Sequence, residues 1–473
     1  MFLRQIFDPH LSQYAYIIGC QRTGEAIVID PERDIDRYCA IVAEEGLHIT
    51  AAAETHIHAD FVSGVRELAE DPSVHVYLSA EGGQDWQNEW ASGTGNTTLL
   101  HDGDSFNIGK IQFKVIHTPG HTPEHLVYLV TDIGGGANEP MVLLTGDFLF
   151  VGDVGRPDLL EQAAGLVGTQ EAGARELYAS LRRVSNLPCH LQILPAHGAG
   201  SACGKALGSV PNSTFGYEAK FNHAFKLAVD GSEEDFVQFI LSGQPEPPAY
   251  FANMKRVNKV GPAVLGSLPQ PREMSLDEVA RRLDEPSFVV LDTRNRAAFI
   301  AGHLRRSLFT PAKKFADFAG SYLTPQDEIV IVVKDTASTD EYVRQLVRMG
   351  FDKIVGSLSA SAVESAPGTL KTTTRSVEFT EVPALLANDS RLRLLDVRKA
   401  TEFAEGHLHN ALNIAHTRLL PRLQELSSTN FPMLVHCASG LRALGTCAFL
   451  NRVGVENICI ADNFENAPKE LLA

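Results

Sequence analysis

The sequence predicts an α+β domain of many short strands, followed by two α/β repeats that each contain a parallel sheet. Up to about residue 260, short β-branched runs alternate with Gly-, Asp- and His-rich turns, a pattern typical of strands whose loops carry function. Two later segments repeat each other, and each alternates strand and helix patterns. Residues 263–274 and 366–377 lack periodicity and are predicted linkers. We therefore expect domains at 1–262, 275–365 and 378–473.

Composition limits the classes of partner. The chain has 473 residues, with 41 Lys and Arg against 58 Asp and Glu, for a net charge of −17. This charge repels phosphate backbones and anionic lipid, so we expect neither nucleic acid nor membrane as a partner. The seven cysteines are odd in number and lack paired spacings. With no apolar stretch long enough to span a membrane and no signal-peptide pattern, we expect a cytoplasmic protein.

Four loops in the first domain carry His and Asp in an ordered set. Imidazole and carboxylate ligands are commonly donated to a metal from loops that follow strands. The four loops are residues 55–61 (THIHADF), 118–122 (TPGHT), 145–147 (TGD) and 195–198 (PAHG). All four match, in order, the ligand motifs of the metallo-β-lactamase fold, which the domain therefore resembles. The resemblance implies an αββα sandwich in which His56, His121 and Asp147 hold one metal ion.

One position departs from the family pattern. Dinuclear members have His-x-His-x-Asp-His, whereas this chain has Phe61 in place of the last His. A phenyl ring cannot ligate a metal, so we expect His58, Asp60 and His197 to orient the ligands of a single site rather than to build a second one. Two His and one carboxylate form the facial triad of non-haem Fe(II) oxygenases. We therefore expect one Fe(II) per chain.

Four stretches surround the predicted site: HADFVSG (58–64), GHTPEH (120–125), GDVGRPDLL (152–160) and CGKALGSVPNSTFGYE (203–218). These motifs resemble those of persulfide dioxygenases. The resemblance implies a low-molecular-weight thiol persulfide of the glutathione type and O₂ as substrates, and sulfite and thiol as products.

Several further side chains are candidates for the substrate pocket. Arg156 could pair with a carboxylate or phosphate of the carrier thiol, a role that suits its planar fork, or could form a structural salt bridge. Tyr217, Lys255 and Asn258 are also expected to line the pocket. Cys203 is either a thiol that forms a mixed disulfide or persulfide, or an inert buried thiol.

The second repeat carries a candidate nucleophile. The stretch LDTRNRAAFIAGHL (291–304) aligns without a gap with LDVRKATEFAEGHL (395–408), an offset of 395 − 291 = 104. Downstream, the loop HCASGLR (436–442) joins an apolar strand to a helix, where a helix N-terminus favours the thiolate of Cys437. Loop amides and Arg442 would hold an anion. This repeat resembles a rhodanese domain, which implies that Cys437 carries sulfane sulfur.

The first repeat lacks that nucleophile. Aligning Val333 with Val435 puts Asp335 in the place of Cys437, and a carboxylate cannot carry persulfide sulfur. We interpret 275–365 as an inactive rhodanese module that acts as a scaffold, orients the active module or helps to form a dimer. The residues expected to be structural there are Asp292, Arg294 and His303.

The whole chain resembles bacterial fusions of a persulfide dioxygenase with an inactive and an active rhodanese. Sulfite that attacks a Cys437 persulfide gives thiosulfate, so the resemblance implies conversion of persulfides to thiosulfate in sulfide detoxification. We expect the protein to form a homo-oligomer, a dimer or higher. Two alternatives stay open: a glyoxalase II-like thioester hydrolase with a dinuclear centre, and a sulfur-trafficking protein that binds persulfide without oxidising it.

Overall fold

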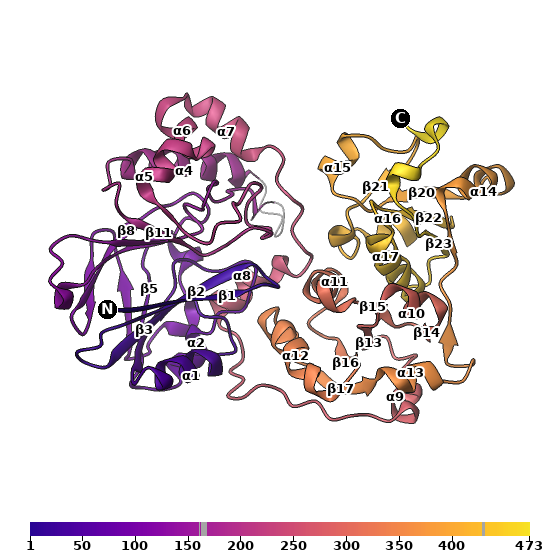
Figure 1. Cartoon of the computed structure of the whole chain (residues 1–473), viewed down its shortest axis with the longest axis horizontal. Coiled ribbons are helices and arrows are strands. Elements are labelled where there is room, and N and C mark those ends of the chain that lie inside the picture. The colour runs from indigo at the N-terminus through magenta and orange to yellow at the C-terminus, as the bar shows by residue number, and fades with distance from the viewer. Residues whose placement is uncertain (160, 162–167, 428–430) are drawn as a thin grey trace. The chain divides into compact units, whose positions relative to one another are not determined.

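The computed structural model describes residues 1–159, 161, 168–427 and 431–473. The last residue of the 152–160 motif lies outside the described residues. The chain divides into two compact units, residues 1–244 with 251–266, and residues 245–250 with 267–473 (Figure 1). Within the described residues, no helix is both long and apolar enough to cross a bilayer.

The first unit contains two sheets. Among the described residues, each sheet has six strands, in the orders β1-β2-β3-β4-β5-β6 and β12-β11-β10-β9-β8-β7. The strands of the first sheet are β1 (Phe2–Asp8), β2 (Gln13–Gly19), β3 (Glu25–Ile29), β4 (His48–Ala53), β5 (His75–Ser79) and β6 (Thr97–Leu100). Those of the second are β7 (Ser105–Ile108), β8 (Ile111–His117), β9 (Leu126–Thr131), β10 (Val142–Gly146), β11 (Gln192–Pro195) and β12 (Ser213–Thr214).

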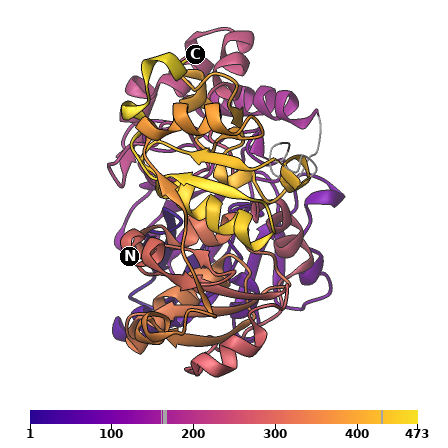
Figure 2. The ribbon, with the colours of Figure 1, turned by 90° about the vertical axis from the view of Figure 1, so that its right-hand side faces the viewer.

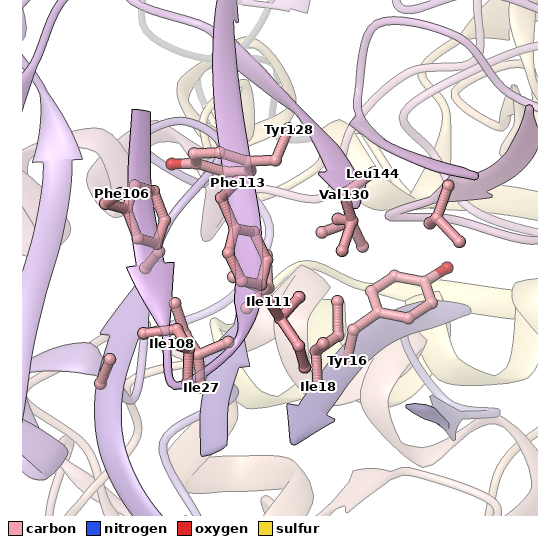
Figure 3. Close-up of a cluster of buried hydrophobic side chains, with 14 of the residues drawn as sticks. Tyr16, Ile18, Ile27, Phe106, Ile108, Ile111, Phe113, Tyr128, Val130 and Leu144 are labelled. Carbon is pink, nitrogen blue, oxygen red and sulfur yellow. The ribbon is translucent and has the colours of Figure 1, made fainter. Parts of the chain in front are cut away.

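The two sheets pack face to face, and helices cover their outer faces. Strand β2 shows why: Tyr16 and Ile18 point into the core between the sheets, while Ala15 and Ile17 belong to the core on the opposite face. Figure 3 shows Tyr16 and Ile18 beside Ile111 of the facing sheet. The helices are α1 (Asp36–Glu44) and α2 (Val65–Ala69) on the first sheet, and α4 (Thr169–Val184), α5 (Phe215–Phe221), α6 (His223–Asp230) and α7 (Glu233–Leu241) on the second.

The second unit holds both repeats, each built on a parallel sheet (Figure 2). The first sheet has the order β15 (Leu308–Phe309), β13 (Phe288–Asp292), β16 (Glu328–Val333) and β17 (Ile354–Ser359). The second has the order β19 (Ser376–Val377), β23 (Asn457–Ile460), β22 (Met433–His436), β20 (Arg393–Asp396) and β21 (Leu412–Asn413). The helices are α9 (Leu276–Arg282), α10 (Arg296–Ala301), α11 (Phe315–Tyr322), α12 (Thr339–Arg348), α13 (Ala360–Ser365), α14 (Val382–Asn388), α15 (Ala400–Ala404), α16 (Leu423–Ser427) and α17 (Leu441–Arg452).

The predicted fold class is confirmed: an αββα sandwich precedes two α/β repeats. The stretch 366–377, expected as a linker, contains two short strands. Strand β18 (Lys371–Thr372) pairs with β14 (His303–Leu304) of the first repeat, and β19 joins the sheet of the second. Polar residues without periodicity can still supply edge strands, because an edge strand needs only one partner.

Candidate metal centre and sulfur-transfer loop

The three predicted ligands and the neighbouring His197 lie in loops at strand ends of the first unit. His56 comes shortly after β4, Asp147 directly after β10, and His197 shortly after β11, while His121 lies in the loop between β8 and β9. Gly146 allows this convergence. It has a φ of 50°, and a Cβ there would lie 2.6 Å from both His125 Nε2 and Thr55 Oγ1.

Three buried side chains, His56, His121 and Asp147, offer ligand atoms that all lie within 4.8 Å of one another. The Thr55 hydroxyl donates to Asp30, so it accepts from His56 Nδ1, which leaves the lone pair of His56 on Nε2. His121 Nδ1 donates to the Arg156 carbonyl at 2.9 Å, which leaves its Nε2 lone pair 3.4 Å from Asp147 Oδ2.

These atoms fit a metal ion. Burial lowers the pKa of His121 to about 4 and that of His56 well below its ordinary value, so both imidazoles are neutral, the form that ligates a metal. A neutral imidazole lone pair and a carboxylate oxygen facing each other at 3.4 Å are two acceptors with no proton between them. A cation bound between them would satisfy both.

A second group of possible ligands lies beside the first. Asp60, His197 and Cys203 also offer atoms within 4.8 Å of one another, and His197 Nε2 lies 3.3 Å from Asp147 Oδ1 and from Asp60 Oδ2. Burial and the nearby Asp60 and Asp147 raise the pKa of Cys203 well above its ordinary value. A neutral thiol is a poor nucleophile, so the structure does not favour a reactive Cys203. Phe61 is fully buried, with its ring centroid 4.3 Å from that of His58.

Buried polar contacts fix the loop of His56. Asp30 accepts from the Thr55 amide at 2.7 Å and lies 3.2 Å from His58 Nε2, consistent with an orienting role for His58. Asn258, in α8 (Phe251–Val260), donates to the carbonyls of His58 and Phe61 at 2.8 Å. The prediction that Asn258 lines the pocket is wrong, because its side-chain amide donates both of its hydrogen bonds to carbonyls of the His56 loop.

Two other candidate pocket residues also lie elsewhere, and for Arg156 the structure favours the expected alternative, a structural salt bridge. Arg156 is 1% exposed, with its guanidinium on Asp158 at 2.9 and 2.7 Å and on the Ala202 carbonyl at 2.8 Å, so it forms a buried structural pair rather than a carrier site. Tyr217 is 55% exposed on α5 and packs on Phe221, and it does not line the cavity described next.

A cavity of about 810 Å³ opens beside His121. Lys255 lies on its wall, with Nζ 3.5 Å from the centroid of the Trp86 ring. Arg256 lies on the same wall, exposed, and no carboxylate among the described residues lies within salt-bridge distance of it. Lys259 follows one turn later, 3.3 Å from Glu89. The helix α8 thus presents three cations to a cavity that reaches a predicted metal ligand, and the same lining includes the carboxylates of Asp85, Glu89 and Glu176.

The second unit presents Cys437 between β22 and α17. Its Sγ accepts from the amide of Ala443 at 3.3 Å, in the first turn of the 12-residue α17. Arg442 is paired with Glu402 at 2.6 and 2.7 Å and also bonds the Cys437 side chain. Sequence reasoning missed Glu402. A comparison of the two repeats could have found it, because the repeat with Cys437 has a glutamate at this position and the repeat without it has Ala298.

The motif shared by the repeats is structural in both. Arg294 pairs with Asp292 and donates to the Gly302 carbonyl at 2.9 Å, and His303 Nδ1 lies 2.8 Å from the Phe299 carbonyl. The equivalent contacts recur in the second repeat, from Arg398 to Asp396 and the Gly406 carbonyl, and from His407 to Phe403. The first repeat has exposed Asp335 in place of the buried Cys437.

The fold and the four ligand loops define a domain with a candidate metal site, joined to two α/β modules of one repeated fold. The model of the metallo-beta-lactamase superfamily matches residues 9–197, and that of the rhodanese-like domain matches residues 275–364 and 379–464. The chain belongs to the metallo-beta-lactamase superfamily and carries two rhodanese-like domains.

Individual relatives narrow this class. The mitochondrial persulfide dioxygenase ETHE1 of Bos taurus is 30% identical over 202 residues, which cover 42% of this chain and 68% of that protein. A hydroxyacylglutathione hydrolase of Gloeobacter violaceus is 32% identical over 185 residues, covering 39% of this chain and 63% of its own length. The crystal structure of a metallo-beta-lactamase from Staphylococcus aureus is 38% identical, with a TM-score of 0.67, and covers 76% of this chain and 99% of that one. The chain is thus a fusion of a domain homologous to persulfide dioxygenases with two rhodanese-like domains.

Proposed function

We propose that this protein oxidises a low-molecular-weight thiol persulfide to sulfite at one Fe(II) and combines the sulfite with sulfur carried on Cys437 to give thiosulfate. The observation that carries the proposal is the triad of His56, His121 and Asp147 beside a cavity that His121 itself lines and to which α8 contributes three cations. Two imidazoles and one carboxylate are the donor set of non-haem Fe(II) oxygenases. The similarity to a persulfide dioxygenase supports the choice of substrate.

The first reaction balances as RSSH + O₂ + H₂O → RSH + SO₃²⁻ + 2 H⁺. A bound iron would supply a centre at which O₂ and the outer sulfur meet. The chain positions the substrate: Lys255, Arg256 and Lys259 attract the anionic groups of a carrier such as glutathione, and the persulfide reaches toward His121. Burial of the triad keeps bulk water from the reacting sulfur.

The second reaction takes place at Cys437. Its thiolate attacks the outer sulfur of a second persulfide, the S–S bond breaks, and the carrier thiolate leaves. Sulfite then attacks the outer sulfur of the Cys437 persulfide, which releases thiosulfate and restores the thiolate. The amide of Ala443 and the guanidinium of Arg442 stabilise the negative charge that both steps place on sulfur.

Oxygen uptake tests the first reaction. The protein is reconstituted with Fe(II) without air, and O₂ consumption is followed after glutathione persulfide is added. We expect uptake with one iron per chain, and none in a His121→Ala variant. No uptake by the iron-loaded protein, with persulfide bound, would instead favour the sulfur-trafficking alternative.

Product analysis tests the second reaction. Cys437→Ser should leave oxygen uptake unchanged and shift the product from thiosulfate to sulfite, while Cys447→Ser, in the helix that follows the Cys437 loop, serves as the matched control. Thiosulfate formation that persists in Cys437→Ser would refute the sulfur relay.

The thioester hydrolase is a second candidate, favoured by the group of Asp60, His197 and Cys203, which could hold a second ion. The identity with a hydroxyacylglutathione hydrolase also favours it. Metal analysis distinguishes the two candidates, because a dinuclear hydrolase requires two ions per chain. Hydrolysis of a glutathione thioester with two bound ions would replace the dioxygenase proposal.

A further inference from the structure

The first rhodanese-like module holds both ends of α17, the helix that follows the Cys437 loop in the second module. At the C-terminal end, Arg452 donates to the carbonyls of Arg306, Pro286 and Phe288 at 3.0, 2.6 and 3.1 Å. Between the ends, Tyr322 of the first module stacks on Phe449, with centroids 5.0 Å apart. Helix α17 of the second module is therefore packed along its length on the first module.

Arg296 forms the contact at the N-terminal end. This residue begins α10 of the first module, and its Nη1 donates to the Ser439 carbonyl at 3.0 Å. Its Nη2 donates to the carbonyl of Ala461, just after β23. One guanidinium thus ties the Cys437 loop to the neighbouring strand end. Gly440 permits the approach: its φ is 77°, and a Cβ there would lie 2.9 Å from Arg296 Nη2.

We propose that Arg296 is a positioning residue for sulfur transfer, contributed to the Cys437 loop by the module that lacks a nucleophile. This inference rests on the proposed sulfurtransferase function. Arg296 contacts the loop carbonyl at Ser439, two residues after Cys437, and not the sulfur. By fixing that carbonyl it fixes the turn through Gly440 into α17, and so the direction in which the Ala443 amide meets the Cys437 sulfur.

The repeat alignment agrees with this division of roles. Position 296 of the first repeat corresponds to Ala400 of the second, which has no guanidinium. The first repeat in turn has Ala298 where the second has Glu402, the partner of Arg442, and Asp335 where the second has Cys437. The first module has lost the groups that act on sulfur and carries instead a cation that binds the loop of its neighbour.

Arg452 provides a matched control. It also joins α17 to carbonyls of the first module, and it makes three such hydrogen bonds where Arg296 makes two. It lies at the opposite end of a 12-residue helix, about 16 Å from the loop at 1.5 Å per residue. A loss of module packing alone would therefore affect an Arg452 variant at least as strongly as an Arg296 variant.

The test uses the full chain and the transfer S₂O₃²⁻ + CN⁻ → SO₃²⁻ + SCN⁻, measured as thiocyanate. We expect Arg296→Met to lower kcat about tenfold, because the loss of one well-directed hydrogen bond to a charged sulfur costs roughly 1.4 kcal/mol. KM for thiosulfate should stay within about twofold of wild type. Arg296→Lys, which can still reach one carbonyl, should recover to within about threefold of wild type. Arg452→Met should stay within about twofold, and oxygen uptake should be unchanged in all three.

Each outcome decides between the claims. If Arg296→Met and Arg452→Met lose activity equally, or if the loss lies in KM alone, Arg296 is not a positioning residue. If Arg296→Met unfolds, the same comparison is made between Arg296→Lys and Arg452→Lys, with the same criterion. If wild type forms no more thiocyanate than Cys437→Ser, the proposed sulfurtransferase function fails instead, a result that the Arg296 variants do not influence.

Discussion

The buried pair of Arg156 and Asp158 allows a direct test of whether Arg156 stabilises the first unit. Arg156→Met removes a guanidinium that makes two hydrogen bonds to Asp158 and one to the Ala202 carbonyl. The carboxylate of Asp158 is 3% exposed, so the variant leaves a charge in the interior without this partner. Breaking a buried ion pair in this way costs about 3–5 kcal/mol. We expect that loss in the free energy of unfolding of the first unit.

Tryptophan fluorescence in urea measures this loss selectively. The chain has two tryptophans, Trp86 and Trp90, and both lie in the first unit. The double variant Arg156→Met with Asp158→Leu is the control, since replacing both members of a buried pair by apolar groups is close to neutral. It should recover most of the lost stability.

A different result would refute the structural role of Arg156. If Arg156→Met changes the free energy of unfolding by less than about 1 kcal/mol and instead raises KM for the persulfide, the guanidinium serves the carrier thiol. The same conclusion follows if the double variant is no more stable than Arg156→Met.

Three further predictions address the loop, the cavity and the second repeat. Asn258→Leu leaves the carbonyls of His58 and Phe61 unpaired and should cost about 2–4 kcal/mol, with iron affinity lowered at least tenfold in a competition titration against a chelator. Arg256→Met should raise KM for glutathione persulfide about three- to tenfold with kcat unchanged, whereas a fall in kcat alone would contradict its role in binding the carrier. Burial lowers the pKa of His436 to about 4, so the unfolded chain takes up its proton first and stability falls as pH falls from about 6.5 toward 4. From pH 7 to pH 5 the loss of stability amounts to about 2 kcal/mol. His436→Gln should abolish this pH dependence, as measured by the hydrogen exchange of α17 amides after correction for intrinsic rates. An unchanged pH dependence would exclude His436 as the cause.

Three features can be predicted from the sequence because each is a local pattern. They are the order of the ligand loops, the 104-residue repeat and the absence of a cysteine at the nucleophile position of the first repeat. A His or Asp directly after a strand pattern lies at the end of that strand, and a Cys before a helix pattern lies at its N-terminus. The local patterns, together with the family resemblances of their motifs, therefore determined the fold class, the triad as candidate ligands and Cys437 as the candidate sulfur carrier.

The tertiary structure decided which partner each polar side chain takes. Arg156 binds a carbonyl 46 residues away, Asn258 one that is 200 residues away, and Arg296 one that is 143 residues away in the other module. No periodicity encodes such pairings, because they depend on how the sheets and modules pack and on the need to satisfy every polar group that packing buries. For that reason Arg156 and Asn258, expected to contact substrate, instead bind other parts of the protein, and the repeat that lacks the cysteine contacts the Cys437 loop of the other repeat.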